Sequence, residues 1–124
     1  MGDVPLPMVA VDDIGKSVAN IFANKLLIGK SAYVASDILT CNQIAEHLGK
    51  KIGNPVSYYN MDDETYRGLP FPGAKELGNM FAFKREYKNF AENRKQQTSK
   101  VLKNPIKFDV WLNTHAEAIK KNIK

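Results

Sequence analysis

Apolar residues recur along the chain at two spacings, one typical of helices and one typical of strands. Ile14, Val18, Ile21 and Phe22 follow one another at i, i+4, i+7 and i+8, which places them on one helical face. Short apolar runs at residues 8–11, 32–36 and 56–59 predict three strands. The pattern predicts an α/β fold in the order strand, helix, strand, helix, strand, then helices.

Local signals predict where the first two helices begin and end. Asp12 or Asp13 is the expected N-cap of the first helix, because a short carboxylate can accept hydrogen bonds from first-turn amides. Residues 40–43 read Thr-Cys-Asn-Gln, the spacing of a capping box that starts the second helix. Gly49 is expected to end that helix, since glycine is common just after the last turn.

A predicted helix over residues 74–90 is apolar on more than one face, which is more than a surface helix requires. It follows a loop stiffened by two prolines. We expect Phe71, Met80 and Phe83 to line a cleft, because ligand pockets are mainly apolar and often lie between domains. Plain core packing of the same three side chains is the alternative. In the final helix, Trp111 and Leu112 are expected to anchor the core.

The length of the chain predicts one domain over residues 1–124. Of its residues, 44% are apolar and 25% are charged. Its apolar runs are far shorter than the ~20 residues of a membrane helix. Its first residues lack the basic start of a signal peptide. The single cysteine, Cys41, excludes an internal disulfide and is expected to be buried. We therefore expect a soluble protein of the cytoplasm or nucleus, without a membrane partner.

The net charge of +5 is concentrated in residues 84–107. Against two acidic residues this segment holds eight basic ones: Lys84, Arg85, Lys88, Arg94, Lys95, Lys100, Lys103 and Lys107. Such a stretch can attract nucleic acid. A solvated helix face explains it more simply, and no aromatic stacking pattern accompanies it.

Several catalytic and binding motifs are absent from the sequence. There is no Gly-x-Gly-x-x-Gly turn for a dinucleotide and no Tyr-x-x-x-Lys pair for proton relay. His47, His115 and Cys41 are too few and too dispersed for a zinc site. The acidic run 62–64 is better explained by helix capping than by a bound cation. No catalytic, cofactor-binding or metal-binding residue is therefore predicted.

Three segments of the chain contain motifs that are similar to those of one protein family. Residues 1–15 contain Met-Gly-Asp-Val-Pro and Val-Asp-Asp-Ile-Gly. Residues 66–81 are the most specific, with Phe-Pro-Gly-Ala, then Leu, then Asn-Met-Phe. Residues 108–112 are similar to the family's closing Phe-Asp-x-Trp-Leu. Together the three segments resemble the C-terminal portion of the NmrA-like family, a group of atypical short-chain dehydrogenases. The likeness covers nearly the whole chain and is weakest over residues 84–107.

This resemblance implies the small C-terminal domain of an atypical short-chain dehydrogenase, with a few short strands plus helices and the Rossmann half missing. In the family, a Rossmann domain binds NADP(H), and the portion matched here forms one wall of a cleft. The family's cofactor contacts lie upstream of that portion, so none is carried over. NADP is thus the cofactor expected for the full-length family protein, and none is expected for this chain alone.

The implied function is that of a non-catalytic, NADP(H)-sensing redox sensor, such as a regulator of transcription, with this chain binding protein partners. Exposed apolar surface would also favour self-association. Two alternatives stay open. One is part of an NAD(P)H-dependent reductase of the isoflavone-reductase-like or quinone-reductase-like kind. The other is a nucleic-acid-binding module that uses the basic segment 84–107.

Overall fold

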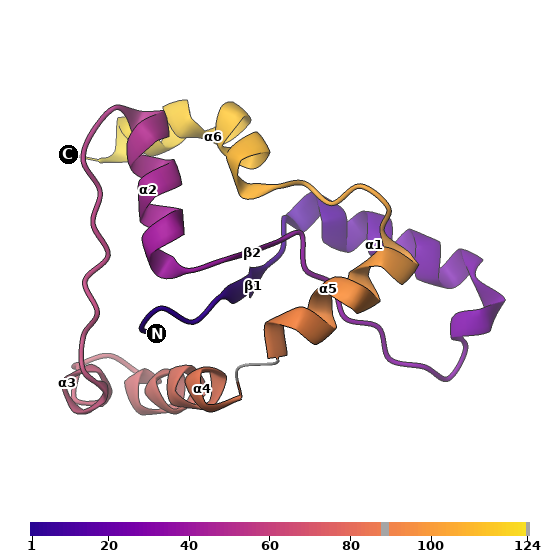
Figure 1. Ribbon diagram of the computed structural model, residues 1–124, viewed down its shortest axis with the longest axis horizontal. Helices are drawn as coiled ribbons and strands as arrows, with labels where there is room; N and C mark the ends of the chain where they lie inside the picture. Colours follow the sequence, from indigo (N-terminus) through magenta and orange to yellow (C-terminus); the bar gives the residue numbers. More distant parts are fainter. Residues whose placement is uncertain (88–89, 124) are drawn as a thin grey trace.

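The computed structural model describes residues 1–87 and 90–123, which form a small α/β domain. In Figure 1, two strands lie near the middle of the molecule, with α2 beside α6 at one end and α1 near α5 at the other. In chain order the elements are β1 (Leu6–Met8), α1 (Val11–Ala23), a 3₁₀ turn η1 (Lys25–Leu27), β2 (Asp37–Leu39), α2 (Cys41–Ile52), α3 (Asp63–Arg67), α4 (Ala74–Glu86), α5 (Phe90–Val101) and α6 (Phe108–Asn122).

The strands differ from those predicted. β1 and β2 pair antiparallel, with Leu6 opposite Leu39 and Met8 opposite Asp37. β1 shares only Met8 with the predicted run 8–11, and β2 begins directly after the predicted run 32–36. The reason is that Val11 already belongs to α1, which leaves only the preceding residues to pair. The third predicted strand, 56–59, is part of the connection between α2 and α3. Figure 1 shows this connection running along one edge, away from β1 and β2, and a strand needs a partner.

Helix α1 begins two or three residues earlier than expected, and neither predicted aspartate caps it. Ala10 is the N-cap, while Asp13 lies inside the first turn and is fully buried. Ser17, one turn further on, is also buried. On the same side of the helix, the Asn20 side-chain amide donates a 2.8 Å hydrogen bond to the Val101 carbonyl at the end of α5. Helix α1 therefore packs its polar face, not its apolar face, against the rest of the chain.

Helix α2 begins as predicted but ends later. Thr40 and Gln43 form the complete capping box, with each side chain accepting a hydrogen bond from the other residue's backbone. The helix continues past Gly49 to Ile52 and is capped by Gly53, whose φ of 79° is left-handed. Gly49 has a different role, because a Cβ there would lie 3.0 Å from the Asn54 carbonyl oxygen. It is glycine so that the returning chain can pass close by.

The second half of the chain is helical, as predicted. Asp62 caps α3, where its carboxylate accepts a hydrogen bond from the Thr65 amide. Helix α4 ends at Glu86, short of the predicted residue 90. Residues 88–89, which include the basic Lys88, lie outside the described part of the chain.

The core is small and divided among pairs of helices. Leu112 and Ala116 of α6 are buried against α2, which contributes Ala45 and Ile52. Leu112 is only 1% exposed, as predicted. Trp111 departs from the prediction because it is only half-buried: its ring stacks on its own helix instead of entering the core. Across the described residues, no helix has the length and apolar character required to cross a membrane.

Candidate functional site

The three predicted cleft residues are exposed on and beside α4. Met80 and Phe83 lie on the helix, and Phe71 lies in the loop before it, with exposed fractions of 37%, 49% and 40%. Phe71 makes an edge contact with Tyr66 at 6.2 Å between ring centroids, and Phe83 lies against Tyr87 at 4.4 Å. This chain alone does not enclose them, so the plain-core alternative does not hold. That Phe71, Met80 and Phe83 face another domain across a cleft stays a prediction.

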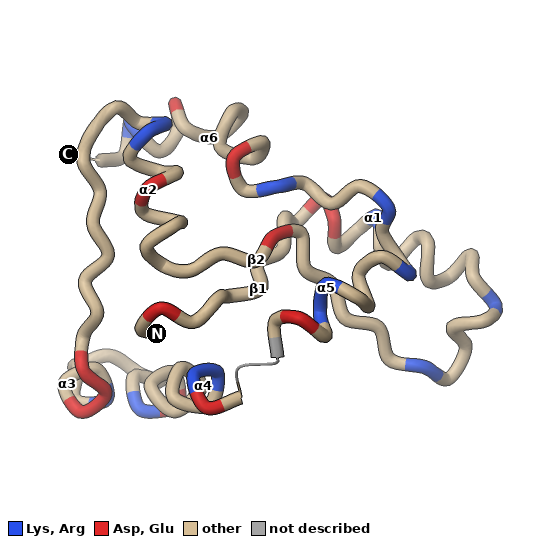
Figure 2. The backbone as a smooth tube through the Cα atoms, in the orientation of Figure 1, with Lys and Arg blue, Asp and Glu red and all other residues tan. Residues whose placement is uncertain are grey.

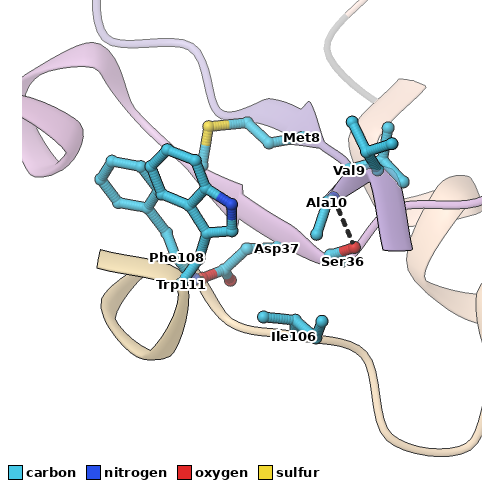
Figure 3. A pocket seen from close by; sticks show the side chains of 9 residues that line it. Met8, Val9, Ala10, Ser36, Asp37, Ile106, Phe108 and Trp111 are labelled. Atoms are coloured by element: carbon cyan, nitrogen blue, oxygen red, sulfur yellow. Dashed lines mark hydrogen bonds between the residues drawn. The ribbon is translucent and has the colours of Figure 1, made fainter. Parts of the chain in front are cut away.

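A different feature is concave: an apolar hollow of about 220 Å³ between the strands and the start of α6, called here the Trp111 hollow. In Figure 3, Phe108, Trp111 and Met8 form one wall, while Val9, Ala10 and Ser36 lie on the other side. The Trp111 ring is stacked between those of Phe108 and His115, with centroid distances of 6.1 and 4.0 Å. The lining residues are Met8, Val9, Ala10, Val11, Ser36, Asp37, Ile106, Phe108 and Trp111.

Among the described residues that line the Trp111 hollow, Asp37 alone is ionisable, and it is already hydrogen-bonded. Asp37 accepts hydrogen bonds from the Phe108 amide at 3.0 Å and from the Lys107 ammonium at 3.3 Å. Burial raises the pKa of Asp37, but these hydrogen bonds, with one from the Ile38 amide, outweigh burial and lower it. The Asp37 carboxylate therefore stays ionised, and its oxygens are engaged in these hydrogen bonds. The rest of the hollow offers a mainly apolar surface. Its volume is below the ~300–1,000 Å³ of small-molecule sites, and it suits a single side chain.

A buried carboxylate holds the segments around the hollow together. Asp13 of α1 accepts hydrogen bonds from the Ser36 hydroxyl and the Ile106 amide, both at 2.6 Å. Both donors come from residues that line the hollow. Ser36 in turn accepts a 3.0 Å hydrogen bond from the Ala10 amide, drawn in Figure 3. The polar side of α1 is thus used to fix the hollow's shape.

The opposite side of α1 is apolar and exposed. Val11 and Phe22 have 80% and 86% of their surface exposed, and Ile14 and Val18 each have 45%. These four residues are called here the α1 apolar face. Val11 also lines the Trp111 hollow, so the face and the hollow form one continuous surface. Beyond the helix, Leu26 and Ile28 extend it with exposures above 75%.

A second hollow, of about 330 Å³, lies between α2, α4 and the 58–66 segment. Cys41 lines it and is half-buried, where burial was expected. Burial, with a smaller contribution from the Cys41 thiol, raises the pKa of the Tyr58 hydroxyl, so the tyrosine stays protonated at neutral pH. Arg85 forms an ion pair with Asp63 at the rim.

The basic segment 84–107 is partly engaged within the chain. Arg85 pairs with Asp63, Lys107 binds Asp37, and the Arg94 guanidinium lies 4.0 Å from the centroid of the Tyr33 ring. Figure 2 shows that the lysines and arginines of the described residues are spread along several elements of the backbone. No group of three metal-binding side chains occurs in the part of the chain that the structure describes.

Sequence reasoning missed both the hollow and the orientation of α1. The hollow joins residues about a hundred positions apart, and no local pattern marks them. For α1, a usable signal was present: Asp13, Ser17 and Asn20 share one helical side, and that side could have been recognised as a second candidate for burial.

The chain matches the model of a known protein family. A model described as the NmrA-like family matches residues 1–112 of the 124-residue chain. The matched range contains every residue of the α1 apolar face and every residue that lines the Trp111 hollow. It ends at Leu112, inside α6.

Proposed function

The chain belongs to the NmrA-like family, and we propose that it is the partner-binding part of a non-catalytic, NADP(H)-sensing regulator of that family. The observation that carries this proposal is the orientation of α1. Its Asp13 and Ser17 are buried, while Val11 and Phe22 are almost fully exposed. A helix turned this way has an apolar face that only another domain or protein can cover.

The energetics support a binding role for that face. Burying a Val, Ile or Phe side chain contributes about 1.5–3 kcal/mol. The α1 apolar face and its extension through Leu26 leave several such side chains in water. Contiguous apolar patches of a few hundred Å² or more mark interaction sites on soluble proteins. The Trp111 hollow adds a recess on the same surface that fits one inserted side chain.

The residues that the structure describes do not fit the nicotinamide dinucleotide itself. A pyrophosphate needs free amides at a helix N-terminus. An acidic residue lies in the first turn of each of α1, α4, α5 and α6 and would repel it. In α2, the Thr40 side chain already occupies the Gln43 amide. We therefore assign nucleotide sensing to the whole family protein and the partner surface to this chain.

The competing function is an NAD(P)H-dependent reductase, in which the same apolar residues would contact a substrate. NADPH titration of the full-length gene product, with and without a quinone acceptor, separates the two. A sensor binds NADPH and does not oxidise it faster when the quinone is added. Quinone-dependent turnover would overturn the proposal in favour of the reductase.

A further inference from the structure

We propose that the second hollow binds a small planar aromatic anion, an arylcarboxylate, with its ring among the aromatic side chains and its charge on the Arg85 guanidinium. The inference goes beyond the proposed function, which concerns the α1 apolar face. The second hollow does not involve α1. Its walls come from the N-terminal residues, α2, the 58–66 segment and α4, so this chain alone forms it.

The size and lining of the second hollow suit a small ligand. Its volume of about 330 Å³ falls within the ~300–1,000 Å³ of small-molecule sites, which the Trp111 hollow does not reach. Four aromatic side chains line it: Tyr58, Tyr59, Tyr66 and Phe81. Aromatic rings prefer edge-to-face or offset contacts with other rings. A planar aromatic ligand can therefore make with these walls the contact that Tyr66 and Phe81 already make with each other, at 5.4 Å between ring centroids.

The charge at the edge of the second hollow favours an anion. Among the described residues that line it, Asp63 carries a negative charge and Arg85 a positive one. Asp63 is shared, because the Arg67 guanidinium also lies 3.8 Å from its carboxylate. Two guanidinium groups therefore face one carboxylate, and two positive charges minus one negative charge leave the cluster with a net charge of +1.

Arg85 has hydrogen-bond donors to spare for a ligand. A guanidinium carries five N–H donors in a planar fork, and among the described residues Arg85 uses its Nη2 on Asp63. Its side chain lines the hollow and is 29% exposed, so the group is within reach of a ligand. By contrast, the Tyr58 hydroxyl already donates to Asn60 at 2.9 Å. The ligand carboxylate is thus expected at Arg85, because a planar fork of donors matches two carboxylate oxygens.

The second hollow lies on a different side of α4 from the predicted cleft wall. Gly78, Phe81 and Arg85 follow one another at i, i+3 and i+7, so they share one side of the helix. Met80 and Phe83 are exposed elsewhere on α4 and do not line the hollow. A ligand in the hollow would therefore not contact the side of α4 that is predicted to face another domain.

Protection of Cys41 from alkylation tests the proposal on the full chain. Cys41 lines the second hollow and is the only cysteine in the sequence, so its reaction with iodoacetamide, followed by mass spectrometry, reports on this place alone. We expect naphthoate to slow the reaction saturably, with a Kd of about 1 mM or tighter, which follows from the usual binding energy per non-hydrogen atom. No protection at concentrations well above that value overturns the proposal.

Two further probes separate the ring from the charge on the unmodified chain. Naphthalenemethanol has the same rings without the charge, and cyclohexanecarboxylate has the charge without an aromatic ring. Each should need at least a tenfold higher concentration than naphthoate to protect Cys41. Equal protection by the alcohol would refute the role of Arg85, and equal protection by cyclohexanecarboxylate would refute an aromatic ligand.

A pair of variants tests Arg85 directly. Arg85→Gln should raise the naphthoate concentration needed for protection at least tenfold, because it removes the charged partner of the carboxylate. The matched control is Lys84→Gln, which removes the same charge from the neighbouring residue of α4, whose side chain does not line the hollow. Circular dichroism verifies that both variants stay helical. Equal protection in the two variants contradicts the proposal. These results are independent of the quinone assay, so their failure leaves the proposed function standing.

Discussion

The Ser36 hydroxyl donates a 2.6 Å hydrogen bond to the fully buried carboxylate of Asp13. Through the same carboxylate, α1 is also tied to the Ile106 amide just before α6. Three segments far apart in the sequence are thus joined at one side chain. This junction fixes which side of α1 faces the chain, and it thereby decides that the apolar side faces outward.

Asp13→Ala should lower the free energy of unfolding by about 3 kcal/mol. The change leaves the Ser36 hydroxyl and the Ile106 amide without their acceptor, and each unsatisfied buried group costs about 1–3 kcal/mol. Urea unfolding followed by circular dichroism measures the loss. Asp12→Ala is the matched control because Asp12 is exposed, and it should change stability by less than about 0.5 kcal/mol. Equal losses in both variants would contradict a special role for Asp13.

Stability should fall in acid because of the same carboxylate. Burial raises the pKa of Asp13, but hydrogen bonds from Ser36, Ile106 and Lys16 outweigh it and hold the pKa below the ~3.9 of a free aspartate. The pKa of Asp37 is lowered in the same way. Since the unfolded chain then binds protons more readily, this stabilisation is complete above about pH 5 and is lost as the pH falls through the folded-state values.

Urea midpoints measured between pH 6 and pH 3 test the acid effect. The midpoint of the unmodified chain should decline below about pH 4.5. Asp13→Asn, which cannot titrate, should start lower and decline less steeply. An identical slope in the two proteins would show that other carboxylates carry the acid sensitivity.

Ser17→Ala should be neutral or stabilising by up to about 1 kcal/mol. The Ser17 hydroxyl is buried one turn after Asp13 and has no hydrogen-bond partner among the described residues. Removing an unsatisfied buried hydroxyl removes its desolvation cost, and alanine is the better helix former. Thermal melts provide the measurement. A loss above about 1 kcal/mol would mean that the hydroxyl makes a bond, for instance to a buried water.

The features that the sequence predicted well are local. The capping box of Thr40 and Gln43 involves residues three apart, so its geometry follows from the chain itself once a helix starts there. The same holds for the cap at Asp62. The family resemblance was also readable, because the motif in residues 66–81 is long and specific, and the family match over residues 1–112 confirms it.

The features that the sequence did not predict depend on distant partners. The outward apolar face of α1 follows from Asp13 finding Ser36 and Ile106, and Ile106 lies 93 positions away. Helical periodicity marks an apolar side without saying what covers it. The Trp111 hollow likewise needs β1 and α6 to meet. Gly49 was misread because its contact, Asn54, lies on the returning chain and not within the helix.

Leu112 and Trp111 should differ in their effects despite being neighbours. Leu112 is enclosed between α6 and α2, so Leu112→Ala should cost about 2–5 kcal/mol through lost burial and a new cavity. Trp111 is half-buried and stacks on Phe108 and His115, so Trp111→Ala should cost about 1–2 kcal/mol. Urea unfolding of both variants gives the order. A larger loss for Trp111 would mean that the hollow is a closed part of the core.

The isolated chain should not bind NADPH measurably. Binding the dinucleotide requires helix-terminal amides that face a phosphate, and here the first turns carry Asp12 and Asp13 in α1, Glu76 in α4 and Asp109 in α6. Titration calorimetry of the chain with NADPH should show no heat of binding up to about 1 mM. A Rossmann-fold dehydrogenase measured in the same buffer verifies that the assay detects binding. Micromolar affinity in the isolated chain would place a nucleotide site within these residues, and the partner-binding proposal would then have to give way to a cofactor-binding one.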